Sequence, residues 1–120
     1  MVVDSSVWLE IIGNGPLCSK CEKLLKGEKK QLSALALFEI YRKLKKKISE
    51  EAALEATSYL SQFDVIEVNR DIALHAADLS IEHKLSMADS LMLATAHQHN
   101  SNLLTLDNDF VGVPGAIVVR

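Results

Sequence analysis

Short apolar runs alternate with longer stretches in which apolar residues recur at helical spacing, from the start of the chain to its end. The short runs are rich in Val, Ile and Leu and are bounded by turn residues, which is typical of buried strands. We therefore expect strands at 1–3, 31–34, 65–68, 102–106 and 116–119. The longer stretches predict helices at about 5–12, 16–26, 37–48, 49–62, 69–83 and 86–96. Strands separated by helices favour parallel pairing, so the pattern predicts an α/β fold with a short central parallel sheet flanked by helices.

Polar residues and one proline mark where several of these helices begin. Asn69 and Ser86 precede two of the apolar stripes and are well suited to N-cap positions. Pro16 is expected to open the second helix, because its fixed φ angle suits a first helical turn. The helix after Ser86 is apolar on nearly every face from Met87 to Ala96. A helix of that kind is predicted to lie in the middle of the protein.

Length and composition suit a single domain. The chain has 120 residues, of which 48% are hydrophobic, so we expect residues 1–120 to form one unit around one core. No apolar stretch approaches the roughly 18 residues that a membrane span needs. The acidic Asp4 follows only three residues after the start, which is unlike a signal peptide. The sequence therefore predicts a cytoplasmic protein that does not associate with membranes.

Charge is distributed unevenly along the chain. The segment from Lys20 to Lys47 holds ten basic and three acidic residues, a local balance of +7, although the whole chain carries −3. The remainder therefore carries −10. This asymmetry permits a basic patch for phosphates beside an acidic pocket for a metal. The run from Arg42 to Lys47, taken alone, is equally typical of a solvated face that complements a helix C-terminus.

Two cysteines, Cys18 and Cys21, form an isolated Cys-Ser-Lys-Cys sequence. A zinc site needs two more ligands, and no second cysteine pair or nearby histidine supplies them. A thioredoxin-like motif should follow a strand, whereas these residues follow a turn and lie three apart on an expected helix. We therefore expect reduced, structural cysteines.

Acidic residues recur where an expected strand gives way to a helix: Asp4, Glu39, Asp89 and Asp107, with Asp109 next to the last. The carboxyl ends of parallel strands meet at one crevice, so acids far apart in sequence are expected to meet there. Crowded carboxylates repel one another, which suggests that a cation normally lies between them. Asp89 has the strongest case, because an ionisable group at the entrance of the most apolar helix needs a partner.

Most of these acids also have a purely structural interpretation. Asp4 is a suitable cap for the first helix. Glu39 lies opposite the apolar stripe of its helix, where a solvated i,i+4 pair with Lys43 is a reasonable alternative. One of Asp107 and Asp109 is able to cap a short turn while the other faces the crevice. Asp107 is closer to the end of its strand and is ranked first.

Four segments together resemble the PIN-domain nucleases and, more narrowly, the VapC-type toxins of toxin–antitoxin pairs. They are Val3-Asp4-Ser5-Ser6-Val7-Trp8, Glu39, Ala88-Asp89-Ser90-Leu91 and Leu104-Thr105-Leu106-Asp107-Asn108-Asp109-Phe110. The resemblance extends over essentially the whole chain. Each motif is short, and it is their order and spacing that make the combination specific. The resemblance implies a PIN-like three-layer sandwich.

The resemblance also implies residue roles, a cofactor and partners. Asp4, Glu39, Asp89 and Asp107 would form the catalytic acidic quartet, of which Asp4, Asp89 and Asp107 would bind Mg²⁺ or Mn²⁺, with Thr105, Asp109 and Ser5 in support. Arg42, Lys43 and Lys46 are candidate RNA-binding residues. Carboxylates around an open site suit these hard cations, which activate water and stabilise charge on a phosphate. The family implies RNA cleavage, a homodimer and neutralisation by a small VapB-like antitoxin.

Three other functions are compatible with parts of the pattern. A phosphorelay receiver domain also gathers acids at strand ends, but it needs an Asp after a central strand and a Lys after a late strand. Here Asp64 precedes its expected strand, and no lysine follows Lys84. The other two are a PIN-domain nuclease in RNA processing outside a toxin–antitoxin pair, and a PIN fold that only binds RNA or protein. A binding module would be expected to have lost some of the acids.

Overall fold

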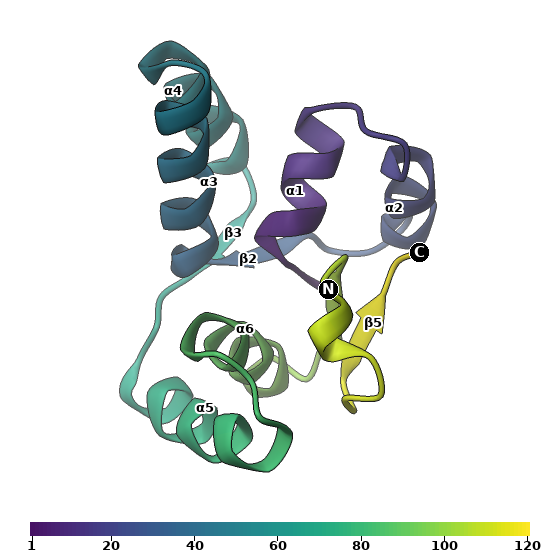
Figure 1. Cartoon of the computed structure of the whole chain (residues 1–120), viewed down its shortest axis with the longest axis vertical. Coiled ribbons are helices and arrows are strands. Elements are labelled where there is room, and N and C mark those ends of the chain that lie inside the picture. Colours follow the sequence, from purple (N-terminus) through teal and green to yellow (C-terminus); the bar gives the residue numbers. More distant parts are fainter.

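A computed structural model describes all residues from Met1 to Arg120 and shows a five-stranded sheet flanked by six α-helices. The strands are β1 (Val2–Val3), β2 (Gln31–Ser33), β3 (Asp64–Ile66), β4 (Leu103–Thr105) and β5 (Ala116–Val118). All pairings are parallel, in the order β3-β2-β1-β4-β5 (Figure 1). The predicted α/β class and its parallel sheet are confirmed.

The helices lie on both sides of the sheet. They are α1 (Ser5–Ile12), α2 (Cys18–Leu25), α3 (Ala34–Lys47), α4 (Glu50–Leu60), α5 (Arg70–His83) and α6 (Met87–Gln98), with a short 3₁₀ helix at Asn108–Phe110. In Figure 1, α1 and α2 lie above the strands, α5 and α6 lie below them, and α3 pairs with α4. Helix α6 packs against β1 and β4, as its apolar character predicts. No helix combines the length and the hydrophobicity needed to cross a lipid bilayer.

Sheet order places a topological switch point between β1 and β4. From β1 the chain continues to β2 on one side, whereas β4 pairs with β1 on the other side. Helices diverge at such a switch point and leave an opening beyond the carboxyl ends of the strands. Asp4 is the first residue after β1, and its backbone N–H donates to the Leu104 carbonyl at 2.9 Å. The fold therefore holds Asp4 beside the end of β4.

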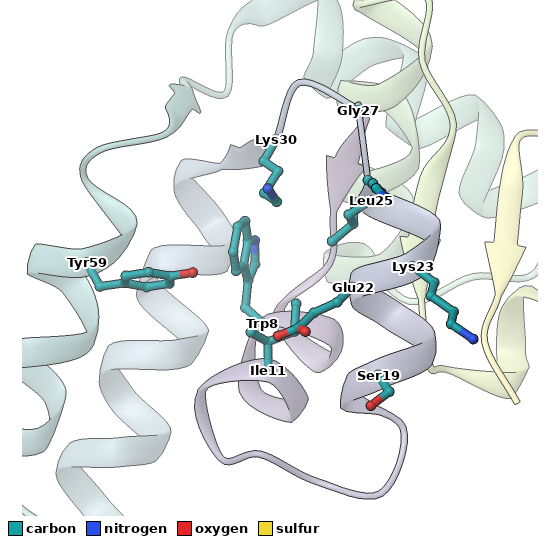
Figure 2. A pocket seen from close by; sticks show the side chains of 10 residues that line it. Trp8, Ile11, Ser19, Glu22, Lys23, Leu25, Gly27, Lys30 and Tyr59 are labelled. Atoms are coloured by element: carbon teal, nitrogen blue, oxygen red, sulfur yellow. The ribbon is translucent and has the colours of Figure 1, made fainter.

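A cluster of aromatic side chains joins α1 to α4 and to the residues that follow α4. Trp8 is fully buried, and its ring lies 5.1 Å from Phe63 and 6.3 Å from Tyr59, measured between centroids. Figure 2 shows Trp8 between Tyr59 and the α2 segment. Its indole Nε1 has no hydrogen-bond partner. Large aromatic residues bury much apolar surface, so Trp8 anchors the helix that follows the first strand.

Several predicted boundaries are wrong by one to three residues. Strand β3 begins at Asp64, one residue before the prediction, because Asp64 pairs with Gln31 of β2 in the parallel ladder, and the two side chains are also joined by a 3.0 Å hydrogen bond. Helix α2 begins at Cys18, and Pro16 lies in the preceding turn. Met87, at the start of α6, is 76% exposed, so this helix is not buried at every apolar position as predicted.

Candidate active site

Three carboxylates converge at the carboxyl ends of the strands. Asp89 belongs to the first turn of α6, Asp107 follows β4, and Asp109 lies in the 3₁₀ helix. One oxygen from each lies within 4.8 Å of the other two. Ser86 caps α6 by accepting the Asp89 backbone N–H at 3.2 Å, which fixes the helix turn from which the Asp89 side chain extends. Such a group of oxygen ligands is suited to a divalent cation.

Asp4 is buried beside this cluster and is only 5% exposed. Its Oδ2 accepts hydrogen bonds from Thr105 at 2.7 Å and from Ser6 at 2.8 Å. Asp4 occupies the N-cap position of α1, yet it makes no side-chain cap hydrogen bond. The Asp4 carboxylate therefore does not cap the helix, and the purely structural interpretation of Asp4 is wrong. Asp4 is not a member of the 4.8 Å cluster, which consists of Asp89, Asp107 and Asp109.

Two hydroxyl groups connect Asp4 to the loop that carries the cluster. The Thr105 hydroxyl donates to Asp4 and accepts the backbone N–H of Asp107 at 3.0 Å. The Ser6 hydroxyl donates to Asp4 and accepts the backbone N–H of Leu106 at 3.0 Å. Sequence reasoning selected Thr105 and Ser5 but missed Ser6. The Asp-Ser-Ser sequence was the available signal, although it does not say which serine faces β4.

Glu39 lies apart from the three aspartates, on α3. The Ser5 hydroxyl donates to Glu39 Oε1 at 3.1 Å, and the side chain is half-buried. Burial raises the pKa of Glu39, while the Ser5 hydrogen bond opposes the increase. Lys43 makes no ion pair with Glu39, so the alternative of a solvated i,i+4 pair is not formed. Glu39 therefore faces α1 and lines the cleft between α1 and α3.

Crowding and burial favour the neutral form of the acids when no cation is bound. Burial, followed by the charges of Asp107 and Asp4, raises the pKa of Asp89 to about 6. Burial also raises the pKa of Asp4, although the Thr105 and Ser6 hydrogen bonds oppose this. A divalent cation among these groups would reverse both effects, because it stabilises the ionised carboxylates.

Asp107 has two roles in this geometry. Its Oδ1 accepts the backbone N–H of Asp109 at 2.9 Å and so begins the 3₁₀ helix. Asp107 is half-buried, whereas Asp109 is exposed, and both reach the cluster. The sequence offered a choice in which one residue capped and the other faced the crevice. In the structure, Asp107 both caps the 3₁₀ helix and belongs to the cluster, and Asp109 also belongs to the cluster.

A basic cleft of about 530 Å³ adjoins Glu39. Its walls come from α1 and α3: Ser5, Ser6, Leu9, Phe38, Glu39, Arg42, Lys43, Lys46 and Lys47. The cleft therefore shares Ser5, Ser6 and Glu39 with the acidic site. Arg42, Lys43 and Lys46, the candidate RNA-binding residues, line one continuous surface. This placement suits a polyanion that extends from the acids along α3.

The cysteines do not contribute to this site. Cys18 and Cys21 are free and buried on α2, and Cys18 Sγ contacts Glu22 at 3.5 Å. Burial raises the pKa of both thiols, which is typical of unreactive structural cysteines. The expectation of reduced cysteines therefore agrees with their environment.

Comparison with known proteins identifies relatives over the whole fold. The PIN domain profile matches residues 1–116. A toxin–antitoxin complex from Klebsiella pneumoniae has a chain 27% identical to this one, with a TM-score of 0.81 over 98% of this chain and 95% of that chain. Mycobacterium tuberculosis VapC20, described as a toxin that cleaves the sarcin–ricin loop, is 21% identical, with a TM-score of 0.80 over 99% and 98%. VapBC2 from Rickettsia felis, bound to a DNA fragment of its promoter, is 18% identical, with a TM-score of 0.78 over 98% and 95%. No curated protein matches the sequence.

Proposed function

The chain belongs to the PIN-domain family, and from this we propose that it is a Mg²⁺- or Mn²⁺-dependent endoribonuclease, the toxin of a VapBC-type pair. The observation that carries the proposal is the group of Asp89, Asp107 and Asp109 oxygens within 4.8 Å of one another. Carboxylate oxygens are the ligands that hard divalent cations prefer. They lie beside Asp4 at the carboxyl ends of the strands, next to the switch point between β1 and β4, which is where ligands bind in open parallel sheets.

Different residues of this chain would bind the ion and orient its ligands at such a site. Asp89 and Asp107 would hold the ion, with Asp109 as a more exposed third ligand. Asp4 has one oxygen occupied by two hydroxyl groups, which orients the other oxygen of its carboxylate. A bound ion supplies charge neutralisation at the phosphate and lowers the pKa of a coordinated water. The proposal needs no serine, histidine or cysteine nucleophile.

Glu39 and the basic cleft are assigned to the substrate. Ser5 holds Glu39 in the wall of this cleft, which supports a role for Glu39 at the scissile phosphate or at a water molecule near it. Arg42, Lys43 and Lys46 would bind phosphates on one side of that position. RNA as the substrate is supported by the likeness to VapC20, a toxin that cleaves the sarcin–ricin loop.

The double substitution Arg42→Ala and Lys46→Ala is expected to raise the KM for RNA by about tenfold and to leave kcat nearly unchanged. Each phosphate contact that is lost should reduce the slope of log affinity against log salt by about 0.7 for a single strand. Lys26→Ala with Lys30→Ala is the matched control, since those lysines line a different cleft that Trp8 also lines; Figure 2 shows Lys30 next to Trp8. If the KM and the salt slope stay at their wild-type values, the α3 surface is only solvated.

A toxin is expected to have a dedicated antitoxin, and the similar Klebsiella chain comes from a toxin–antitoxin complex. Expression of this chain in a bacterium should arrest growth, and co-expression of a small protein encoded directly upstream should restore it. The same protein should co-purify with the chain, which we expect to be a homodimer. Growth arrest should be absent with Asp89→Asn. Arrest that persists with this variant, or no arrest with the wild type, would contradict a nuclease toxin.

A further inference from the structure

An exposed aromatic ring lies on the basic surface of α3. Phe38 is 61% exposed and is the most exposed aromatic residue of the chain. It directly precedes Glu39 and lines the same cleft between α1 and α3. The buried side of this helix is formed by other residues, among them Ala36 and Ile40, which are fully buried. Packing of the hydrophobic core therefore does not account for Phe38.

Phe38 lies between two basic clefts. The second cleft, of about 400 Å³, is lined by Phe38, Tyr41, Arg42, Lys45 and Lys46. Phe38, Arg42 and Lys46 line both clefts. These three residues are four apart on α3, so they follow one face of the helix with about 6 Å between successive positions. The aromatic ring therefore begins a row in which two cations follow it.

The ring and the two cations are not paired with other groups of the chain. Phe38 takes part in no aromatic pair or cation–π contact, and Arg42 and Lys46 form no ion pair. By contrast, the Tyr41 ring is covered by the Lys45 ammonium, 5.5 Å from its centroid. Proteins that bind single-stranded nucleic acids combine exposed aromatic faces, on which bases stack, with cations that bind the phosphates. This surface of α3 has both features.

We propose that Phe38 stacks on an unpaired base of the RNA close to the bond that is cut, so that the substrate is single-stranded at this point. The inference rests on the proposed function, in which the neighbouring Glu39 acts at the scissile phosphate. In a duplex each base is already stacked and paired, and it would have to leave the stack before it could contact Phe38. Arg42 and Lys46 attract any polyanion, whereas the ring selects for unpaired RNA.

RNA binding by the Asp89→Asn protein in EDTA tests this inference without cleavage. The probe is a short labelled RNA of mixed, non-self-complementary sequence, alone or annealed to its complement, and fluorescence anisotropy gives the Kd. Adding Phe38→Ala should weaken binding of the single strand by about ten- to a hundredfold and binding of the duplex by less than about twofold. Phe38→Tyr should keep the affinity for the single strand. Phe38→Leu, which is apolar but has no ring, should weaken it as alanine does.

Leu74→Ala is the matched control, since Leu74 is 64% exposed on α5 and lines neither cleft. Equal single-strand affinities for Phe38→Ala and its Asp89→Asn parent would overturn the stacking role alone. So would an equal loss of affinity for single strand and duplex. A loss that accompanies a change of oligomeric mass in light scattering would also overturn it, because Phe38 would then be a contact between copies. Failure of the parent to bind any RNA would instead contradict the proposed function.

Discussion

Replacing Asp89 with asparagine is expected to abolish RNA cleavage and, in the metal-free protein, to raise the melting temperature. Asparagine keeps the size of the side chain but lacks the charge that a divalent ion needs, so cleavage should fall by about three orders of magnitude or more. The gain in stability has a different origin. It comes from removing a carboxylate whose ionised form is disfavoured by burial and by the charges of Asp107 and Asp4.

The pH dependence of this gain follows from the direction of the pKa shift. Folding raises the pKa of Asp89 from 3.8 to about 6, so the folded state favours the protonated form. The contribution of protonated Asp89 to the stability of the wild-type protein is fully present below pH 3.8 and is lost as the pH rises through 6. A shift of this size corresponds to about 3 kcal/mol at most, and partial solvent screening reduces the expected gain to about 1–2 kcal/mol.

Thermal unfolding in EDTA, followed by circular dichroism, measures this effect. At neutral pH Asp89→Asn should unfold about 3–8 °C above the wild type, and near pH 3.5 the two proteins should coincide. Asp78→Asn is the matched control, because Asp78 is exposed on α5 and lies outside the cluster. An equal or lower melting temperature for Asp89→Asn at neutral pH would contradict a crowded acidic cluster.

Thr105→Val is the second substitution with a large expected effect. Valine has nearly the shape of threonine, so the fully buried site keeps its packing and loses only the hydroxyl group. Asp4 then loses a 2.7 Å hydrogen bond, and the backbone N–H of Asp107 loses its acceptor. Leaving such buried groups unpaired costs about 1–3 kcal/mol. The melting temperature should therefore fall by roughly 5–10 °C.

Cleavage should also decrease, because Thr105 orients both Asp4 and the loop that carries Asp107. We expect a loss of about ten- to a hundredfold in kcat, as is usual when a group that positions metal ligands is removed. Thr105→Ser should restore most of the activity, since it restores the hydroxyl group. Thr95→Val is the matched control, because the buried Thr95 hydroxyl bonds only to the Leu91 carbonyl of its own helix. Equal kcat values for Thr105→Val and the wild type would exclude this positioning role.

The sequence was sufficient to predict the fold class and most of the elements, for identifiable physical reasons. Local signals such as the Asn69 and Ser86 caps depend only on neighbouring residues, and both caps form as predicted. The order of the strands depends on how helices pack across the sheet, which no local pattern encodes. The start of β3 at Asp64 shows the same limit, because it depends on pairing with Gln31 of the adjacent strand, which is distant in sequence.

The candidate site was predictable to a different degree at each residue. Asp89 could be selected from its place at the start of an apolar helix, and the structure brings it to Asp107 and Asp109. Glu39 could be selected only by family resemblance, because its orientation depends on Ser5, thirty-four residues away in sequence. Ser6 was missed for a similar reason, since its bond to the Leu106 backbone crosses from α1 to the loop after β4.

The central claim is that activity depends on a divalent ion bound by the aspartates. The most direct test is whether adding metal restores RNA cleavage to the metal-free protein. Wild-type protein, freed of metal with EDTA, should leave RNA intact, and excess Mg²⁺ or Mn²⁺ should restore cleavage. The same additions to Asp89→Asn should restore nothing. Robust cleavage by the wild type in the continued presence of EDTA would contradict the metal mechanism, and cleavage by Asp89→Asn at the wild-type rate would contradict the site.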